Sequence, residues 1–349
     1  MRFAGLRASW TMLIVMKSGA TQGEIDGVVQ VVERLGFRPH VMPGATRTAI
    51  GITGNQGSVD PIRFEGLPGV FEAIRVSKPY KLITLDLQPD PTVVRAGDAT
   101  IGGKELAVIA GPCAVESRQQ TFAVAAAVRA SGARFLRGGA FKPRSSPYDF
   151  AGLGEEGLKI LADARDAFGL KIVTEALDEP GVDLLEKYAD IIQVGARNMQ
   201  NFSLLRRVGK SKLPVLLKRG IAATIDEWLL AAEYIMSEGN YQVVLCERGV
   251  RTFTLHARNA LDLAAIPVIR RISHLPIVVD ASHAAGKSHL VGPLARAGVA
   301  AGADGIMVEV HNDPDTALCD AAQALTPEEY LKLVTEVRGI HQLLAQAFA

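Results

Sequence analysis

Eight short apolar runs, each followed by a stretch of helical periodicity, fill the chain from Ala107 onward and constrain its fold most. The apolar runs are Ala107–Ala110, Phe135–Leu136, Ile172–Thr174, Ile191–Val194, Val215–Leu217, Val243–Leu245, Ile277–Val279 and Ile306–Val308. The helical stretches are 117–130, 154–168, 179–188, 201–208, 224–237, 260–271, 288–301 and 326–346. This alternation predicts a (β/α)₈ TIM barrel, an α/β fold. The alternative is a doubly wound open sheet, but Gly111-Pro112-Cys113 is not the glycine-rich phosphate loop expected after its first strand.

The first 76 residues follow a different rhythm, which predicts a separate small domain. Their pattern reads strand, helix, strand, strand, short helix, strand, with Gly36 as the stop signal of the first helix. This βαββαβ order is that of a ferredoxin-like α+β domain. Because residues 1–76 hold no cluster of carboxylates, histidines or cysteines, we expect a regulatory role. We predict a proline-bearing linker over 77–91 and the catalytic barrel over 92–349, beginning with a hairpin.

Charge and cysteine content exclude several classes of protein. The 38 Lys and Arg residues balance the 37 Asp and Glu residues to a net charge of +1, whereas nucleic-acid binders need a basic surface. No apolar stretch reaches the roughly 18 residues of a membrane helix. The run Met12–Met16 is too short for a signal-peptide core, and Met12 is an alternative start. Three cysteines fit a reducing compartment, so we predict a cytoplasmic protein that binds neither nucleic acid nor membrane.

Charged or metal-capable side chains follow all eight predicted strands. In a barrel these positions meet at one mouth, and crowding such groups without partners is costly. One set is basic: Arg137, Lys142, Arg144, Arg197, Lys218, Arg219 and Arg248. At a net charge of +1 this set predicts an anionic ligand with more than one phosphate or carboxylate. The alternative is that several of these cations, Arg219 above all, pair with carboxylates of the barrel.

A second set combines one thiol, one imidazole and two carboxylates: Cys113, His283, Glu309 and Asp320. This mixture of soft and hard ligands suits a divalent first-row transition metal. Three of the four follow predicted strands one, seven and eight, which are neighbours in a closed barrel, so we predict a metal site. The alternative for a lone cysteine or histidine is a packing role. We expect Cys319 to point away from the site and Cys246 to pack, and we leave a place at the mouth open for His311.

The motifs around these residues resemble those of the 3-deoxy-D-arabino-heptulosonate 7-phosphate (DAHP) synthases. They are Ala110–Ser117, Leu136–Tyr148, Gln193–Met199, Leu217–Gly220, Cys246–Gly249, Asp280–His283 and Val308–His311. The resemblance covers essentially all of 92–346, and residues 1–76 are similar to the regulatory domain of the type I-beta members. It implies a metal-dependent, aldol-type condensation of phosphoenolpyruvate with erythrose 4-phosphate and water. The products are DAHP and phosphate, and the reaction opens the shikimate pathway to chorismate and the aromatic amino acids.

A sister family, the 3-deoxy-D-manno-octulosonate 8-phosphate synthases, shares the barrel and the phosphoenolpyruvate chemistry and is the alternative. Its loop reads Lys-Ala-Asn-Arg, whereas this chain has Lys142-Pro143-Arg144. The resemblance therefore favours erythrose 4-phosphate as the aldehyde. Ser145 departs from the threonine of many relatives but keeps the hydroxyl.

The resemblance also implies roles for individual residues. The phosphate of phosphoenolpyruvate would be held by Arg197, Arg248 and the backbone near Ala196, and its carboxylate by Lys142 and Lys218 with Arg137 nearby. Arg144 and Ser145 would take the phosphate of erythrose 4-phosphate. The metal, Mn²⁺ first with Fe²⁺, Co²⁺, Zn²⁺ or Cd²⁺ as alternatives, would lie on Cys113, His283, Glu309 and Asp320. Lys142 would deliver a proton to the new alkoxide, through Glu175 or a metal-bound water, and we expect the neighbouring arginines to lower its pKa.

Other interpretations stay open at this point. A Schiff-base aldolase would use Lys142 or Lys218 without a metal, and a non-catalytic barrel would only bind a metabolite and a partner. The family resemblance implies a homotetramer whose small domain binds an aromatic effector, tyrosine or phenylalanine. His40 could reach such an effector, although an exposed strand histidine is the simpler expectation.

Overall fold

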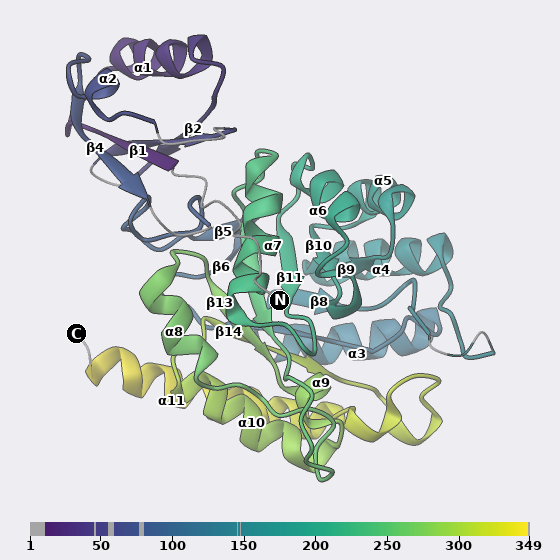
Figure 1. Ribbon diagram of the computed structural model, residues 1–349. Helices are drawn as coiled ribbons and strands as arrows, with labels where there is room; N and C mark the ends of the chain where they lie inside the picture. Colours follow the sequence, from purple (N-terminus) through teal and green to yellow (C-terminus); the bar gives the residue numbers. More distant parts are fainter. Residues whose placement is uncertain are drawn as a thin grey trace, which may run out of the picture. The chain divides into compact units, whose positions relative to one another are not determined.

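The computed structural model describes residues 11–44, 47–54, 59–76, 80–144, 146 and 148–347 and divides into two compact units (Figure 1). The smaller unit runs to Pro91 and includes Ile272–His274, and the larger unit contains Thr92–Arg271 and the chain from Leu275 onward. Ser145 lies outside the described residues. Within these ranges, no helix is long and apolar enough to cross a membrane.

The smaller unit has the predicted βαββαβ order. Its elements are β1 (Thr11–Met16), α1 (Gln22–Arg34), β2 (Arg38–Pro43), β3 (Thr48–Thr53), α2 (Ile62–Glu65) and β4 (Val70–Val76). The strands form an antiparallel sheet in the order β2-β3-β1-β4. Ile14, Ile50 and Phe64 are fully buried in one core with Val28 and Val32 of α1, so this helix packs one apolar face against the sheet.

The expectation for His40 and the view of 77–91 as a plain linker need correction. His40 is only 3% exposed, its Nε2 lies 2.7 Å from Thr53 Oγ1, and burial lowers its pKa to about 4. Residues 80–91 contain no helix or strand, yet Leu82 and Leu87 are buried and pack against Gly51 of the sheet. The sequence did not reveal that this segment packs, because its prolines interrupt the hydrophobic periodicity by which packed elements are predicted.

The larger unit is a closed barrel of eight parallel strands, as predicted. The strands are β7 (Ala107–Gly111), β8 (Phe135–Arg137), β9 (Lys171–Ala176), β10 (Ile191–Val194), β11 (Val215–Lys218), β12 (Val243–Glu247), β13 (Ile277–Asp280) and β14 (Gly305–Glu309). The outer helices are α3 (Arg118–Ala130), α4 (Glu155–Phe168), α5 (Glu179–Tyr188), α6 (Phe202–Gly209), α7 (Ile225–Ser237), α8 (Ala265–Ile272), α10 (Ser288–Ala300) and α11 (Pro327–Ala347). Short helices also occur: α9 (Ala281–Ala285), η1 (Ala196–Asn198), η2 (Pro314–Thr316) and η3 (Ala321–Gln323).

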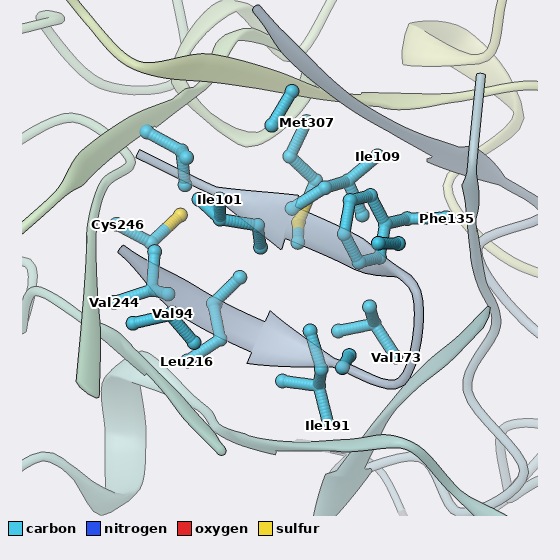
Figure 2. Packing of buried hydrophobic residues seen from close by; sticks show 14 residues of the cluster. Val94, Ile101, Ile109, Phe135, Val173, Ile191, Leu216, Val244, Cys246 and Met307 are labelled. Atoms are coloured by element: carbon cyan, nitrogen blue, oxygen red, sulfur yellow. The ribbon is translucent and has the colours of Figure 1, made fainter. Parts of the chain in front are cut away.

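A hairpin closes one end of the barrel. Strands β5 (Val94–Ala96) and β6 (Ala99–Ile101) pair antiparallel, and Val94 and Ile101 are buried in one apolar cluster with inward residues of the barrel strands. Figure 2 shows these side chains in the same apolar cluster as Ile109, Phe135 and Met307. This core includes residues from the amino-terminal halves of the strands. We therefore expect the polar functional site at the carboxyl-terminal mouth.

Candidate active site

A hollow of about 430 Å³ lies at the carboxyl-terminal mouth of the barrel. Its lining residues are Lys142, Pro143, Arg144, Asp149, Glu175, Ala196, Arg197, Ile221, Arg248, Arg251, Arg258, Asn259, His283, Cys319 and Asp320. Six of these are Lys or Arg and three are Asp or Glu, so the hollow favours an anionic ligand. The sequence predicted Lys142, Arg144, Arg197 and Arg248 at this place.

Arg251, Arg258 and Asn259 were not predicted as site residues. The sequence pattern placed a helix from residue 260, whereas α8 begins at Ala265. The segment that links β12 to α8 is therefore longer than expected, and it brings these three side chains to the hollow. The available signal was two arginines and an asparagine in the segment after a barrel strand.

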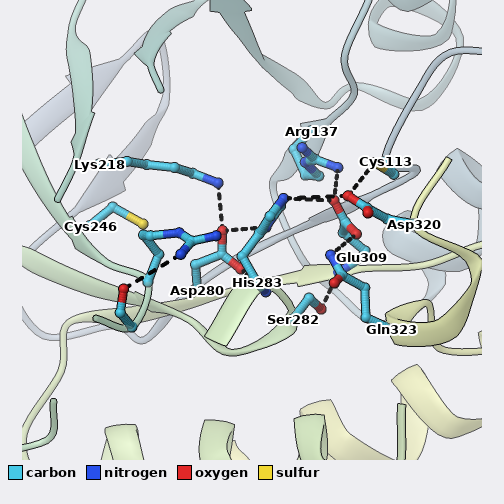
Figure 3. Close-up of polar contacts among 12 residues, drawn as sticks. Cys113, Arg137, Lys218, Cys246, Asp280, Ser282, His283, Glu309, Asp320 and Gln323 are labelled. Carbon is cyan, nitrogen blue, oxygen red and sulfur yellow. Dashed lines mark hydrogen bonds and ion pairs between the residues drawn. The ribbon is translucent and has the colours of Figure 1, made fainter. Parts of the chain in front are cut away.

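The four predicted metal ligands lie together, linked through Asp320 (Figure 3). Cys113 Sγ is 3.3 Å from Asp320 Oδ2. His283 Nε2 is 3.5 Å from Glu309 Oε1 and 3.9 Å from Asp320 Oδ2. The ligand atoms form two groups, Cys113 with Cys319 and Asp320, and His283 with Glu309 and Asp320, which share the carboxylate of Asp320. One thiol, one imidazole nitrogen and two carboxylates gathered in this way are a donor set for a divalent transition metal.

The surroundings of His283 support a cation at this point. Its Nδ1 lies 2.8 Å from Asp280 Oδ2, a carboxylate that favours a proton on Nδ1 and leaves the lone pair on Nε2. That lone pair faces oxygens of Glu309 and Asp320. Because a lone pair and carboxylate oxygens repel one another, a proton or a cation is needed between the imidazole and the two carboxylates. The residues present therefore fit a bound divalent metal.

Buried partners hold the two carboxylates that flank His283. Glu309 is 1% exposed; it receives Arg137 Nη1 on Oε1 at 2.9 Å and Gln323 Nε2 on Oε2 at 2.6 Å. Burial by itself would raise the pKa of Glu309, but the interactions with His283 and Arg137 outweigh it and lower that pKa. Asp280 is fully buried and pairs with Lys218 Nζ at 2.5 Å. Both groups thus stay negatively charged, as metal ligation and imidazole orientation require.

Cys319 contradicts the expectation that it points away. Its Sγ lies 3.1 Å from Cys113 Sγ and accepts a hydrogen bond from Arg144 Nη1 at 2.8 Å. The hydrogen bond from Cys113 lowers the pKa of Cys319 to about 7. Asp320 next to it has a φ of 51°, in the left-handed region, and this turn lets both neighbouring side chains enter the mouth. Adjacent residues of regular strands point to opposite sides, which is why the sequence pattern misled us.

The expected lowering of the Lys142 pKa is also wrong. Burial does lower it, but the interactions with Cys113, Cys319 and Glu309 outweigh both burial and the repulsion from Arg137, and the pKa is raised. Lys142 Nζ lies 3.1 Å from Cys113 Sγ. Lys142 is therefore protonated at neutral pH, which suits a proton donor and an anion ligand rather than a base.

Other predicted residues divide between the hollow and the layer below it. Arg137 and Lys218 are buried in ion pairs with Glu309 and Asp280 and do not line the hollow. Arg219 pairs with Glu247 and Asp262, in line with the structural alternative. Glu175 reaches the hollow because residue 195 is glycine: a Cβ there would lie 2.0 Å from Glu175 Oε1.

Comparison with known proteins gives one consistent result. The DAHP synthetase I family matches residues 86–343, and the DAHP synthase ferredoxin-like domain matches residues 12–78. The phospho-2-dehydro-3-deoxyheptonate aldolase of Thermotoga maritima is 48% identical over 333 residues, 95% of this chain and 98% of its own. A crystal structure of that aldolase, also called DAHP synthase, aligns with a TM-score of 0.76 over 96% of this chain and 98% of its own, at 48% identity.

More distant relatives belong to the sister activity. The 2-dehydro-3-deoxyphosphooctonate aldolase of Syntrophobacter fumaroxidans is 31% identical over 267 residues, which cover 71% of this chain and 92% of that protein.

A truncated T. maritima DAHP synthase aligns at 47% identity with a TM-score of 0.72, covering 76% of this chain and 97% of its own.

Proposed function

This chain belongs to the DAHP synthetase I family, and we propose that its barrel condenses phosphoenolpyruvate with erythrose 4-phosphate and water to give DAHP and phosphate. The observation that best supports this proposal is that the cationic hollow adjoins the donor set of Cys113, His283, Glu309 and Asp320. Two phosphorylated substrates need clustered cations to lie side by side. The metal ligands adjoin these cations, so a metal held there would lie beside the aldehyde group of the bound substrate.

The substrates would divide the hollow between them. We assign the phosphate of phosphoenolpyruvate to Arg197, Arg248 and the backbone near Ala196, all of which line the hollow. Its carboxylate would contact Lys142 and, deeper, Lys218, which it would share with Asp280. Arg144, which lines the hollow near Cys319, would take the phosphate of erythrose 4-phosphate with Ser145.

The reaction then follows from these positions. A divalent cation on Cys113, His283, Glu309 and Asp320, Mn²⁺ before Fe²⁺, Co²⁺, Zn²⁺ or Cd²⁺, would polarise the aldehyde oxygen as a Lewis acid. Carbon 3 of phosphoenolpyruvate attacks the aldehyde carbon, and Lys142 Nζ gives its proton to the aldehyde oxygen. Water adds at carbon 2, with Glu175 placed to take its proton, and phosphate leaves by cleavage of its bond to carbon 2.

The choice of aldehyde is testable by direct comparison. We expect kcat/KM with erythrose 4-phosphate to exceed that with arabinose 5-phosphate by at least about 100-fold, because Lys142-Pro143-Arg144 sets the reach to the aldehyde's phosphate and about 2.7 kcal/mol of transition-state binding gives that ratio. Phosphate release at equal concentrations of the two sugars measures it. Preference for arabinose 5-phosphate would move the chain to the sister activity and leave the barrel chemistry in place.

The ferredoxin-like unit supports regulation of the barrel by an effector. We propose that it binds tyrosine or phenylalanine within a homotetramer in the cytoplasm. Since the catalytic donors all lie in the larger unit, removal of residues 1–76 should abolish inhibition by these amino acids and change kcat by less than about threefold. Initial rates of the full chain and the truncated protein, each with and without 1 mM of either amino acid, test this. Inhibition that survives truncation, or its absence from the full chain, would refute the proposal.

A further inference from the structure

A loop after β14 carries part of the donor set into the mouth. Residues 311–324 leave the barrel and return to it: His311 N donates to Leu325 O at 3.0 Å, and Leu325 N donates to Glu309 O at 2.9 Å. The loop brings Cys319 and Asp320 to the hollow. Its two ends are thus fixed, but Asp320 lies well away from both of them along the chain.

One carboxylate outside the loop holds its middle. Glu116 Oε1 accepts a hydrogen bond from Leu318 N at 2.9 Å, and Glu116 Oε2 lies 3.3 Å from His311 Nε2. The side chains of Glu116 and His311 are 10% and 6% exposed. A single buried carboxylate therefore joins the start of the loop to the residue two positions before Asp320.

The chemistry of His311 defines the direction of this contact. Asp313 N donates to His311 Nδ1 at 3.0 Å, so Nδ1 is an acceptor and the ring proton lies on Nε2. Nε2–H then donates to Glu116. Each carboxylate oxygen of Glu116 thus accepts one hydrogen bond, and no other side chain of similar size offers two acceptor oxygens.

The conformation of Asp320 explains why the loop needs such support. Among the described residues it is the only one other than glycine with a positive φ, at 51°. This left-handed conformation is unfavourable for a residue with a Cβ and persists where the surroundings fix it. Arg258 Nη1 and Nη2 contact Asp320 Oδ1 at 3.3 Å from one side, and the Glu116 contact to Leu318 fixes the backbone just before it.

We propose that Glu116 and His311 are positioning residues, which fasten the loop so that Asp320 presents its carboxylate to the metal. The inference rests on the proposed function, since it takes Asp320 as a metal ligand. Neither Glu116 nor His311 is among the residues that line the hollow, so neither is assigned a contact with substrate.

The test is the affinity of the metal-free protein for Co²⁺, read from the thiolate-to-cobalt charge-transfer absorption that Cys113 supplies. Glu116→Gln keeps the shape, but its amide nitrogen would face one of the two donors. We expect it to weaken Co²⁺ binding by about 10- to 100-fold, the usual effect of losing a partner that orients a ligand. His311→Ala should do the same, and the double variant should be no weaker than Glu116→Gln alone, because His311 acts on the loop through Glu116.

The controls separate positioning from other causes. Asp315→Asn removes an equal charge from an exposed position of the same loop and should bind Co²⁺ like the unaltered chain. At saturating Mn²⁺ the Glu116→Gln protein should regain kcat to within about threefold, whereas a catalytic role would leave it slow. Unaltered Co²⁺ affinity in Glu116→Gln would overturn the inference. Failure of the proposed metal site would look different: the unaltered chain would then show no charge-transfer band with Co²⁺.

Discussion

Replacing Cys113 by alanine should lower kcat/KM by about 10³-fold at micromolar Mn²⁺ and leave the purified protein without stoichiometric metal. The thiolate is the soft ligand of the donor set and lies 3.3 Å from Asp320 Oδ2. Its loss removes Lewis-acid stabilisation worth several kcal/mol, and each 1.36 kcal/mol is about a factor of ten in rate. Metal analysis after dialysis and initial rates across a Mn²⁺ titration measure the two effects.

The matched control for this variant is Cys246→Ala. Cys246 is also buried, but it belongs to the apolar core inside the barrel and not to the donor set. We expect that variant to lose some thermal stability through the small cavity while keeping its metal content. A Cys113→Ala protein with full metal content and full activity would contradict the assignment of Cys113.

Replacing Lys142 by alanine should lower kcat by about 10²- to 10⁴-fold, the usual share of a positioned proton donor. Lys142 is protonated in its setting of Cys113, Cys319 and Glu309, which raise its pKa, and it lines the hollow beside Arg144. Metal binding should persist, because the donor set is intact. Single-turnover phosphate release, with Co²⁺ affinity measured on the same sample, separates chemistry from binding.

Two further observations test the role given to Lys142. Lys142→Arg keeps the positive charge but holds its proton too tightly to donate it, so it should restore substrate binding and not kcat. Full activity of the arginine variant would show that charge alone is needed. Borohydride treatment with either substrate should leave no covalent adduct on the unaltered chain, whereas an adduct on Lys142 or Lys218 would support the Schiff-base alternative.

The fold was predictable because its signals are local and repeated. Strands buried on both faces appear as short apolar runs, and the helices show their own period and caps, as at Thr21 and Glu24 of α1. The one sizeable error, the start of α8, arose where 260–264 continue an apolar pattern without forming a helix. Local periodicity does not reveal which irregular segment folds back over a barrel mouth.

The site was predictable to the level of residue type and strand end, and less so in its pairings. The lowered pKa expected for Lys142 took account of arginine neighbours alone, whereas the interactions with Cys113, Cys319 and Glu309, which come from distant parts of the chain, outweigh the one with Arg137. Arg137 and Lys218 are engaged by Glu309 and Asp280. Such pairs form between different strands, and their formation depends on the register of the closed barrel.

Phosphate release from phosphoenolpyruvate and erythrose 4-phosphate, with DAHP identified by mass, tests the central claim most directly. We measure it in protein stripped with EDTA and again after Mn²⁺ is restored. We predict turnover below about 1% of the original rate after EDTA and recovery with Mn²⁺, one DAHP forming per phosphate. Undiminished turnover in the stripped protein, or phosphate release without DAHP, would contradict a metal-dependent condensation at this mouth.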